Sequence, residues 1–313
     1  MHIQWARSIL ENKGYQVPSN APDVIQDNPW STVYRFKTKQ GYIFLKKIPP
    51  ALSLEANIIK LLHSKFHANV PTIIADNPEF NCFLINDAGI QLHQYFKQHF
   101  NTEIFIKTMQ AYAELQISVT TNTQQFFDLG VPDWRLEKIP SLYDDFIKQE
   151  SLLLEDGLIK ADLLKLKKLK LRLVFLCERL AAYNIKDTFG HADFHDKNIL
   201  INPNTSQTTI IDLGEVVITH PFFSFQNCLH MARENFSLFD NQYNDLQLAC
   251  FAPWLKIESQ KSLFEILSII SQCWPIHAVL GEYRLMNSVE KSEFQKLRRQ
   301  GRLSFKLRRW LDK

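Results

Sequence analysis

The sequence feature that most constrains this chain is the segment FGHADFHDKNILINPNTSQTTIIDLGE at residues 189–215. Its histidines, aspartates and glutamate alternate with two short apolar runs, 199–201 and 210–211. A solvated loop does not need such apolar runs, and a buried strand does not tolerate charges that have no partner. The segment therefore predicts a buried site whose charged groups pair with one another or hold a metal.

The spacing of three residues in this segment indicates a particular chemistry. Asp193 and Asn198 are five positions apart, and Asp212 follows fourteen positions later, so a β-hairpin between the apolar runs would bring Asp212 beside Asn198. Carboxylate and amide oxygens are ligands that Mg²⁺ accepts, together with water and substrate phosphates. Asp193, free of the metal, would accept a proton from an incoming hydroxyl. A base, a metal-holding Asn and a metal-holding Asp are the parts of a phosphoryl-transfer site.

Supporting residues are expected upstream. Two β-rich runs flank TKQG within residues 33–47 and predict a hairpin, and residues 52–63 have the apolar spacing of a helix. Lys46 ends the hairpin, where it would neutralise nucleotide phosphates, and Glu55 on the helix would pair with it. The inward face of the hairpin is not fixed by the sequence, so Lys47 stays an alternative to Lys46.

The chain divides into a β-rich part and a helical part. A strand, an Asn-Pro turn and a second strand precede Gly89, and helical patterns follow, among them 101–118 and one long helix over 159–184. We expect a nucleotide-binding lobe with a leading helix at 1–89 and a helical catalytic and substrate lobe at 90–313. The backbone from Ile85 through Asp87 to Ala88, between the lobes, would contact an adenine ring.

Composition narrows the class of protein. No apolar run reaches the roughly 18 residues that a membrane span needs, so no span is expected. The five cysteines are scattered, with no CxxC pair, which favours buried free thiols and a cytoplasmic location. From Lys291 to Lys313 nine Lys or Arg face two acidic residues. Apolar residues at helical spacing favour a solvated helix face there over a nucleic-acid or lipid contact (Phe294, Leu297, Leu303, Leu307 and Trp310).

The motif HADFHDKNIL resembles the H-x-D-x-H-x-x-N loop of the aminoglycoside phosphotransferase and choline kinase-like superfamily, and IIDLGE resembles that family's metal-binding segment. FLKK, the LE of the 52–63 helix and FLINDAG resemble its lysine, glutamate and hinge, so the likeness runs in order over residues 25–235. It implies an α+β, bilobal, protein-kinase-like fold with a small β-rich N-terminal lobe and a larger, mainly helical C-terminal lobe.

The resemblance also implies roles. Asp193 would be the catalytic base, Asn198 and Asp212 the Mg²⁺ ligands, and Lys46 with Glu55 the clamp on the phosphates of ATP or another nucleoside triphosphate. The loop DNPWSTVY at 27–34 has no glycine and would cover the phosphates through the hydroxyls and amides of its Ser and Thr (Ser31 and Thr32).

Three other polar residues of the segment have open roles. His191 is expected to hold the loop. His195 would bond Asp193, a phosphate or a backbone carbonyl, and Glu215 would either line the acceptor site or cap the next element.

Three functions fit these residues. The first is a kinase that phosphorylates a hydroxyl of a small molecule such as an aminoglycoside, a sugar or an amino alcohol. The second is a pseudokinase or nucleotide-sensing module without turnover. The third is a kinase of protein or lipid acceptors that uses the basic tail for docking. A cationic acceptor would need carboxylates or aromatic rings, for which the sequence offers several candidates (Asp144, Asp145, Glu150, Glu215, Trp254 and Trp274).

Overall fold

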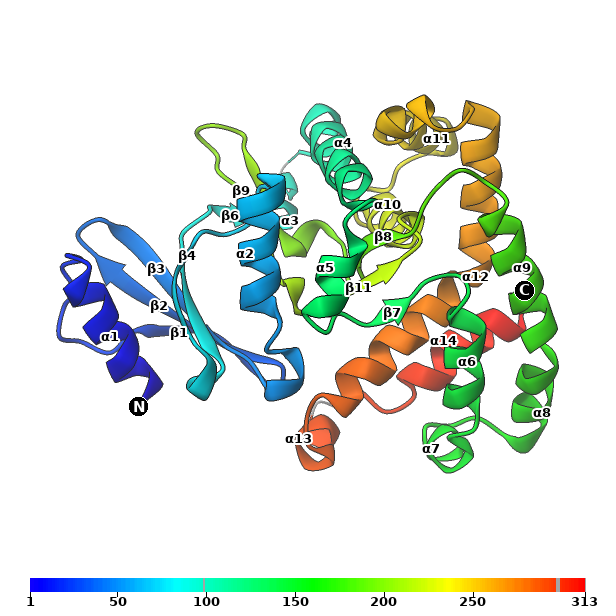
Figure 1. The fold of residues 1–313 in the computed structure, drawn as a ribbon, viewed down its shortest axis with the longest axis horizontal. Coiled ribbons are helices and arrows are strands. Elements are labelled where there is room, and N and C mark those ends of the chain that lie inside the picture. The colour runs from blue at the N-terminus through cyan, green and yellow to red at the C-terminus, as the bar shows by residue number, and fades with distance from the viewer. Residues whose placement is uncertain (98, 297–298, 313) are drawn as a thin grey trace.

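The computed structural model describes residues 1–97, 99–296 and 299–312. Its N-terminal part is an antiparallel sheet in the order β1-β2-β3-β5-β4. The strands are β1 (Asp23–Asn28), β2 (Ser31–Thr38), β3 (Gly41–Lys47), β4 (Ile73–Asn77) and β5 (Cys82–Asn86). Helix α1 (His2–Asn12) covers the outer face of the sheet, and α2 (Glu55–Phe66) lies on the face turned toward the rest of the molecule (Figure 1).

The predicted hairpin around TKQG is β2 and β3, paired from Thr32 opposite Lys47 to Thr38 opposite Gly41. Gly41 closes the turn at a φ of +121°, where a side chain would be strained. Since side chains alternate along a strand, the apolar residues of β3 that pack beneath α1 leave Lys46 on the face of α2. Lys46 is buried and Lys47 is exposed.

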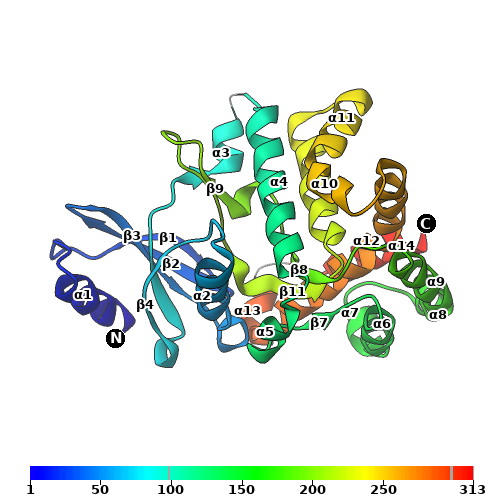
Figure 2. The ribbon, with the colours of Figure 1, turned by 45° about the horizontal axis from the view of Figure 1, so that its top comes forward.

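The larger part is mainly helical (Figure 2). Its helices are α3 (Leu92–Phe96), α4 (Thr102–Val119), α5 (Thr123–Asp128), α6 (Ile139–Ile147), α7 (Glu150–Glu155), α8 (Lys160–Lys168), α9 (Lys170–Ala181), α10 (Phe222–Phe236), α11 (Asp240–Cys250), α12 (Gln260–Asn287), α13 (Lys291–Lys296) and α14 (Arg302–Leu311). Its short strands are β6 (Ile90–Gln91), β7 (Asp133–Trp134), β8 (Thr188–His191), β9 (Ile199–Ile201), β10 (Thr208–Ile210) and β11 (Val216–Thr219). They form sheets in the orders β10-β9-β6 and β7-β11-β8.

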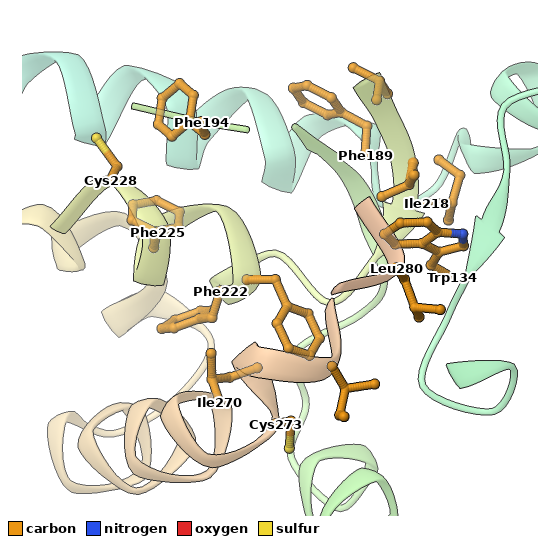
Figure 3. Close-up of a cluster of buried hydrophobic side chains, with 14 of the residues drawn as sticks. Trp134, Phe189, Phe194, Ile218, Phe222, Phe225, Cys228, Ile270, Cys273 and Leu280 are labelled. Carbon is orange, nitrogen blue, oxygen red and sulfur yellow. The ribbon is translucent and has the colours of Figure 1, made fainter. Parts of the chain in front are cut away.

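Aromatic side chains fill the core of the larger part (Figure 3). Phe189 on β8, Phe194 in the following loop and Phe222 on α10 are all fully buried, and the same core includes Phe83 of β5. The five cysteines are buried and free, as predicted. The core is therefore continuous from the sheet to the helices, and the predicted lobe boundary at residue 89 lies in the connection between β5 and β6 but stays a prediction.

Two expectations need correction. The predicted helix over 159–184 is two helices, because α8 ends before Leu169; the Tyr143 hydroxyl donates to the Leu166 carbonyl at this break (2.7 Å). The apolar spacing at the basic end predicted one helical stripe, but two helices, α13 and α14, form this end of the chain. Gly301, which has a positive φ, lies between them. Leu303, Leu307 and Trp310 are buried as expected, whereas Leu297 lies outside the described residues and the Phe294 side chain is not described.

Helix α12 bears on the expectation that the chain has no membrane span. This helix is long and apolar enough, by length and composition alone, to cross a membrane, since its few charges lie near its ends. In the structure 61% of its most apolar window is buried inside the protein, and core helices pass the same test.

Candidate active site

Lys46 joins the sheet to both α2 and the segment after β10. Its ammonium donates to Glu55 Oε2 (2.8 Å) and to Asp212 Oδ1 (2.7 Å), although Asp212 is 166 positions away in the sequence. The N–H of Leu213 donates to Glu55 Oε1 (3.2 Å), so the glutamate is fixed from both sides. The structure thus brings together Lys46, Glu55 and Asp212, as the sequence predicted, and Lys47 takes no part.

Burial and charge act on this network in opposite directions. Burial alone would lower the pKa of Lys46, but the charges of Asp212 and Glu55 outweigh it and raise that pKa. Burial also opposes ionisation of Asp212, yet the Lys46 ammonium holds its pKa below the ordinary value. For Glu55 burial is the stronger effect and raises the pKa. Lys46 and Asp212 are therefore charged near neutral pH.

Asp193 lies in the loop after β8, and Asn198 lies just before β9. The Nδ2 of Asn198 donates to the Asp193 carbonyl (2.9 Å) and lies 3.4 Å from Asp193 Oδ2. Strands β9 and β10 form the predicted hairpin, and the Asn198 carbonyl accepts from the N–H of Ile211 (3.0 Å). The hairpin therefore returns Asp212 to the position next to Asn198.

His195 is a partner of Asp193, one of the alternatives expected for it. Its Nε2 lies 3.2 Å from Asp193 Oδ2, while its Nδ1 accepts from the N–H of Lys197 (3.1 Å). Burial alone would raise the pKa of Asp193 and lower that of His195. The hydrogen bond and opposite charge between them outweigh burial, so the pKa of Asp193 lies below and that of His195 above its ordinary value.

His191 and Glu215 support the loop from behind. His191 is fully buried; its Nε2 donates to the Ile211 carbonyl (3.0 Å) and its Nδ1 accepts from the N–H of Asp193 (3.2 Å). The Glu215 carbonyl accepts from Ala192 (3.3 Å), and burial, with the charges of Asp193 and Asp212, raises the pKa of its side chain well above the usual value.

A cavity of about 490 Å³ opens over this centre. Of the residues predicted for the site, Asp193, Asp212 and four others line it (Ser31, Glu55, His195 and Glu215). Lys46 and Asn198 are not among the lining residues, but each is hydrogen-bonded to one that is. The cavity therefore places the proposed base and one proposed metal ligand against the same space.

The glycine-free loop is the turn between β1 and β2. The Oδ1 of Asn28 accepts from the N–H groups of Trp30 and Ser31 (both 2.9 Å), and the Ser31 hydroxyl accepts from Gln26 (2.6 Å). Thr32 instead donates its hydroxyl to Asp27 (3.1 Å) and does not line the cavity. Of the two predicted loop residues, Ser31 alone therefore faces the cavity.

The structure does not bring the predicted adenine-contacting residues to this cavity. Asp87 is exposed, accepts from the N–H of Gly89 (2.9 Å) and lines other hollows, near Thr72 on one side and Gly41 on the other. Ile85, on β5, is partly buried and packs against the large core. Their contact with adenine stays a prediction.

One wall of the cavity contains residues that the sequence did not indicate. Arg299, Arg302 and Lys306, here called the cationic cluster, line the cavity together with Glu282 of α12. They belong to the segment interpreted as a solvated helix face. That interpretation is wrong for Arg299 and Lys306, which are partly buried, whereas Arg302 lines the cavity but is exposed. The positive charge of this segment was the sequence signal for an anion-binding role. It could not show which of these cations would line the cavity.

Most candidate acceptor residues lie elsewhere. Asp144 pairs with Lys170, Asp145 with Lys148 and Glu150 with Lys167, and Trp254 is fully buried. None of these four candidates lines the cavity, whereas Glu215 and Trp274 do.

The oxygen donors at the end of the hairpin fit a hard cation. In the described part of the chain no three His, Cys, Asp or Glu side chains gather as a metal site. A Mg²⁺ ion would therefore depend on the ionised Asp212 carboxylate and on the Asn198 amide, whose Nδ2 bonds Asp193 and leaves Oδ1 available.

Comparison with known proteins identifies the family and the fold. The model of the phosphotransferase enzyme family matches residues 27–254. No curated protein sequence matches the chain. Among solved structures, a choline/ethanolamine kinase family protein from Mesorhizobium loti is similar at 16% identity, with a TM-score of 0.59 and all of both chains covered.

Two further solved structures have the same fold. An amicoumacin kinase in complex with AMP-PNP and Ca²⁺ is 12% identical, with a TM-score of 0.61, over 100% of this chain and 96% of the other. An aminoglycoside phosphotransferase from Streptomyces rimosus in complex with ADP and streptomycin is 15% identical, with a TM-score of 0.52, over 89% and 99%. The expected bilobal, kinase-like α+β fold is confirmed.

Proposed function

This chain belongs to the phosphotransferase enzyme family, and from that premise we propose that it is an ATP-dependent kinase that phosphorylates a hydroxyl of a small molecule. The observation that carries the proposal is the cavity lined by Asp193 and Asp212. The Lys46 ammonium, which does not line the cavity, is bonded to Asp212. The structural relatives that hold ADP or AMP-PNP support a nucleoside triphosphate as the phosphoryl donor.

In the proposed mechanism each residue has one task. Asp193 accepts the proton of the acceptor hydroxyl through its carboxylate, which His195 orients and keeps ionised at neutral pH. Lys46 binds the nucleotide phosphates and is held by Glu55. Asn198 and Asp212 would hold Mg²⁺, which when bound supplies positive charge to the phosphate oxygens.

One observation favours the alternative, a nucleotide-binding module without turnover. The Trp30 and Ser31 amides bond the Asn28 side chain, so the loop offers fewer N–H groups to phosphates than a glycine-rich loop would. The third function, docking of a protein or lipid by the basic tail, loses support because Arg299, Arg302 and Lys306 line the cavity. A cytoplasmic location stays a prediction.

The experiment that tests the proposal measures phosphate transfer and nucleotide binding together. The purified protein and its Asp193→Asn variant are incubated with ATP, Mg²⁺ and a pooled library of metabolites and aminoglycosides, and products are identified by mass spectrometry. We expect one compound to gain the mass of a phosphate with the wild type alone. Binding of Mg·ATP without any product would favour the nucleotide-binding module, and absence of binding would refute the kinase.

A further inference from the structure

The cationic cluster places three positive side chains around one carboxylate. Glu282 Oε1 lies 2.9 Å from Arg299 Nε, and its Oε2 lies 3.7 Å from Arg302 Nη1 and 3.6 Å from Lys306 Nζ. The Glu282 side chain is 4% exposed, whereas those of Arg299 and Lys306 are 20% and 23% exposed. The Arg302 side chain is 52% exposed, so it is Arg299 and Lys306 that are partly desolvated. The cluster carries two positive charges more than its own carboxylate can balance.

The other carboxylates of the cavity have their own partners or a raised pKa. Asp212 and Glu55 share Lys46, and Asp193 has His195. Glu215 has a strongly raised pKa because of burial and the charges of its carboxylate neighbours. An excess of positive charge therefore remains on the wall formed by α14 and the residues before it.

Partly buried cations are stabilised by an anion that hydrogen-bonds them, and the planar guanidinium groups of arginines match carboxylate and phosphate oxygens. Burial and the positive charges of Arg302 and Arg299 lower the pKa of Lys306. Like charges that are held close together repel one another, and an anion would relieve this repulsion. The Arg299 guanidinium is also stacked over the Trp30 ring (4.7 Å), so its plane is held in place. This wall is therefore suited to bind an anion.

The wall is close to the proposed base. Lys306 and Asp193 line the same cavity. A small molecule in the cavity can thus present a hydroxyl to Asp193 and another group to the cluster.

We propose that the acceptor is a small hydroxylated molecule that carries an anionic group, a carboxylate or a phosphate, and that Arg299, Arg302 and Lys306 bind this group while the hydroxyl faces Asp193. The inference rests on the proposed kinase function and names its substrate class. A cationic acceptor such as an amino alcohol is disfavoured, because Glu282, the carboxylate of this wall, is already paired with the three cations.

The test begins with binding to the full-length protein loaded with Mg·AMP-PNP. Thermal unfolding is followed with sets of hydroxy acids, sugar phosphates, neutral sugars, amino alcohols and aminoglycosides. We expect members of one anionic set to raise the unfolding temperature, and the set that does so distinguishes a carboxylate from a phosphate. Stabilisation by the neutral or cationic sets alone, or by none of them, would overturn the inference.

Variants then locate the anion. Arg302→Gln and Lys306→Gln are expected to weaken binding of the anion by about 10- to 100-fold, the usual effect of a lost charge-assisted hydrogen bond. Lys306→Arg should recover part of that loss. Arg308→Gln is the matched control, because Arg308 lies on the same helix and is exposed, as Arg302 is, but does not line the cavity. Equal losses in all three Gln variants would overturn the assignment.

Two measurements separate the inference from the proposed function. Affinity for Mg·AMP-PNP should be unchanged in the Arg302 and Lys306 variants; a matching loss would mean that the cluster binds the nucleotide phosphates, and would overturn the inference but not the kinase. The bound anion should be phosphorylated from ATP by the wild type and not by Asp193→Asn. If a neutral or cationic compound is phosphorylated instead, the kinase stands and the anionic acceptor does not.

Discussion

Replacement of Lys46 by methionine tests the ion network that joins the two parts of the site. The change removes the cation that bonds both Glu55 and Asp212. Asp212 is 39% exposed and can regain water, so little of the cost falls on it, whereas Glu55 is 3% exposed and loses its charge partner. Breaking a buried pair by removing one partner costs about 3–5 kcal/mol. We expect a loss near the lower end, about 3 kcal/mol at pH 7.5.

The loss should depend on pH. Without Lys46, the pKa of Glu55 rises further above its value in the unfolded chain, because burial is no longer opposed by the ammonium. The folded state then binds a proton that the unfolded state releases as the pH rises. The free energy of unfolding of Lys46→Met should therefore fall from pH 5 upward, by up to about 1.4 kcal/mol per pH unit until the raised pKa is reached.

Urea unfolding from pH 5 to 8 measures both effects. The double variant Lys46→Met/Glu55→Gln should recover most of the loss and its pH dependence, because a neutral amide replaces the unpaired carboxylate. Lys47→Met is the matched control: the neighbouring Lys47 is exposed, and its replacement should change stability by less than about 0.5 kcal/mol. The reasoning is refuted if the glutamine does not rescue Lys46→Met, or if Lys47→Met costs as much.

Other perturbations give distinct outcomes. Burial lowers the pKa of His220 and of His277 to about 3, so each stays neutral in the folded protein. Below pH 6.5 the unfolded state binds more protons, stability falls with the pH, and His277→Phe should remove about 1.4 kcal/mol per pH unit of that slope between pH 6 and 4, as measured by urea unfolding. Trp30→Phe keeps the ring but loses the indole hydrogen bond to the backbone of α12 (2.9 Å), which should cost about 1 kcal/mol in the same assay; an unchanged midpoint would contradict this. His195→Ala removes the donor that lowers the pKa of Asp193, so the acid limb of the kcat/KM profile should move to higher pH, and an unmoved limb would argue against Asp193 as the base.

The features that the sequence predicted correctly are those set by short-range patterns. Alternation along β3 and the spacing of α2 bring Lys46 and Glu55 together nine positions apart, and the β9–β10 hairpin returns Asp212 toward Asn198. Each depends on periodicity or a turn within some twenty residues, which local sequence determines. The break at Leu169 was missed because it has no Gly or Pro, and it coincides with a tertiary hydrogen bond to the Leu166 carbonyl from a tyrosine on α6.

The wall formed by the cationic cluster could not be predicted, because an amphipathic helix has more than two environments. Leu303 and Leu307 of α14 define the face that packs into the core. From the sequence alone, every cation outside this apolar face is therefore expected to be exposed to solvent. Arg302 and Lys306 are one turn apart, on a flank of the apolar face, and the packing of α14 on α12 turns this flank toward the cavity. Arg302 and Arg308 are both exposed, but Arg308 does not line the cavity. Nothing within the helix distinguishes the flank from the outer face. The difference arises only when Glu282, twenty positions before Arg302, lies buried beside it. The proposed substrate class therefore depends on a tertiary contact, while the proposed phosphoryl-transfer residues depend on local spacing.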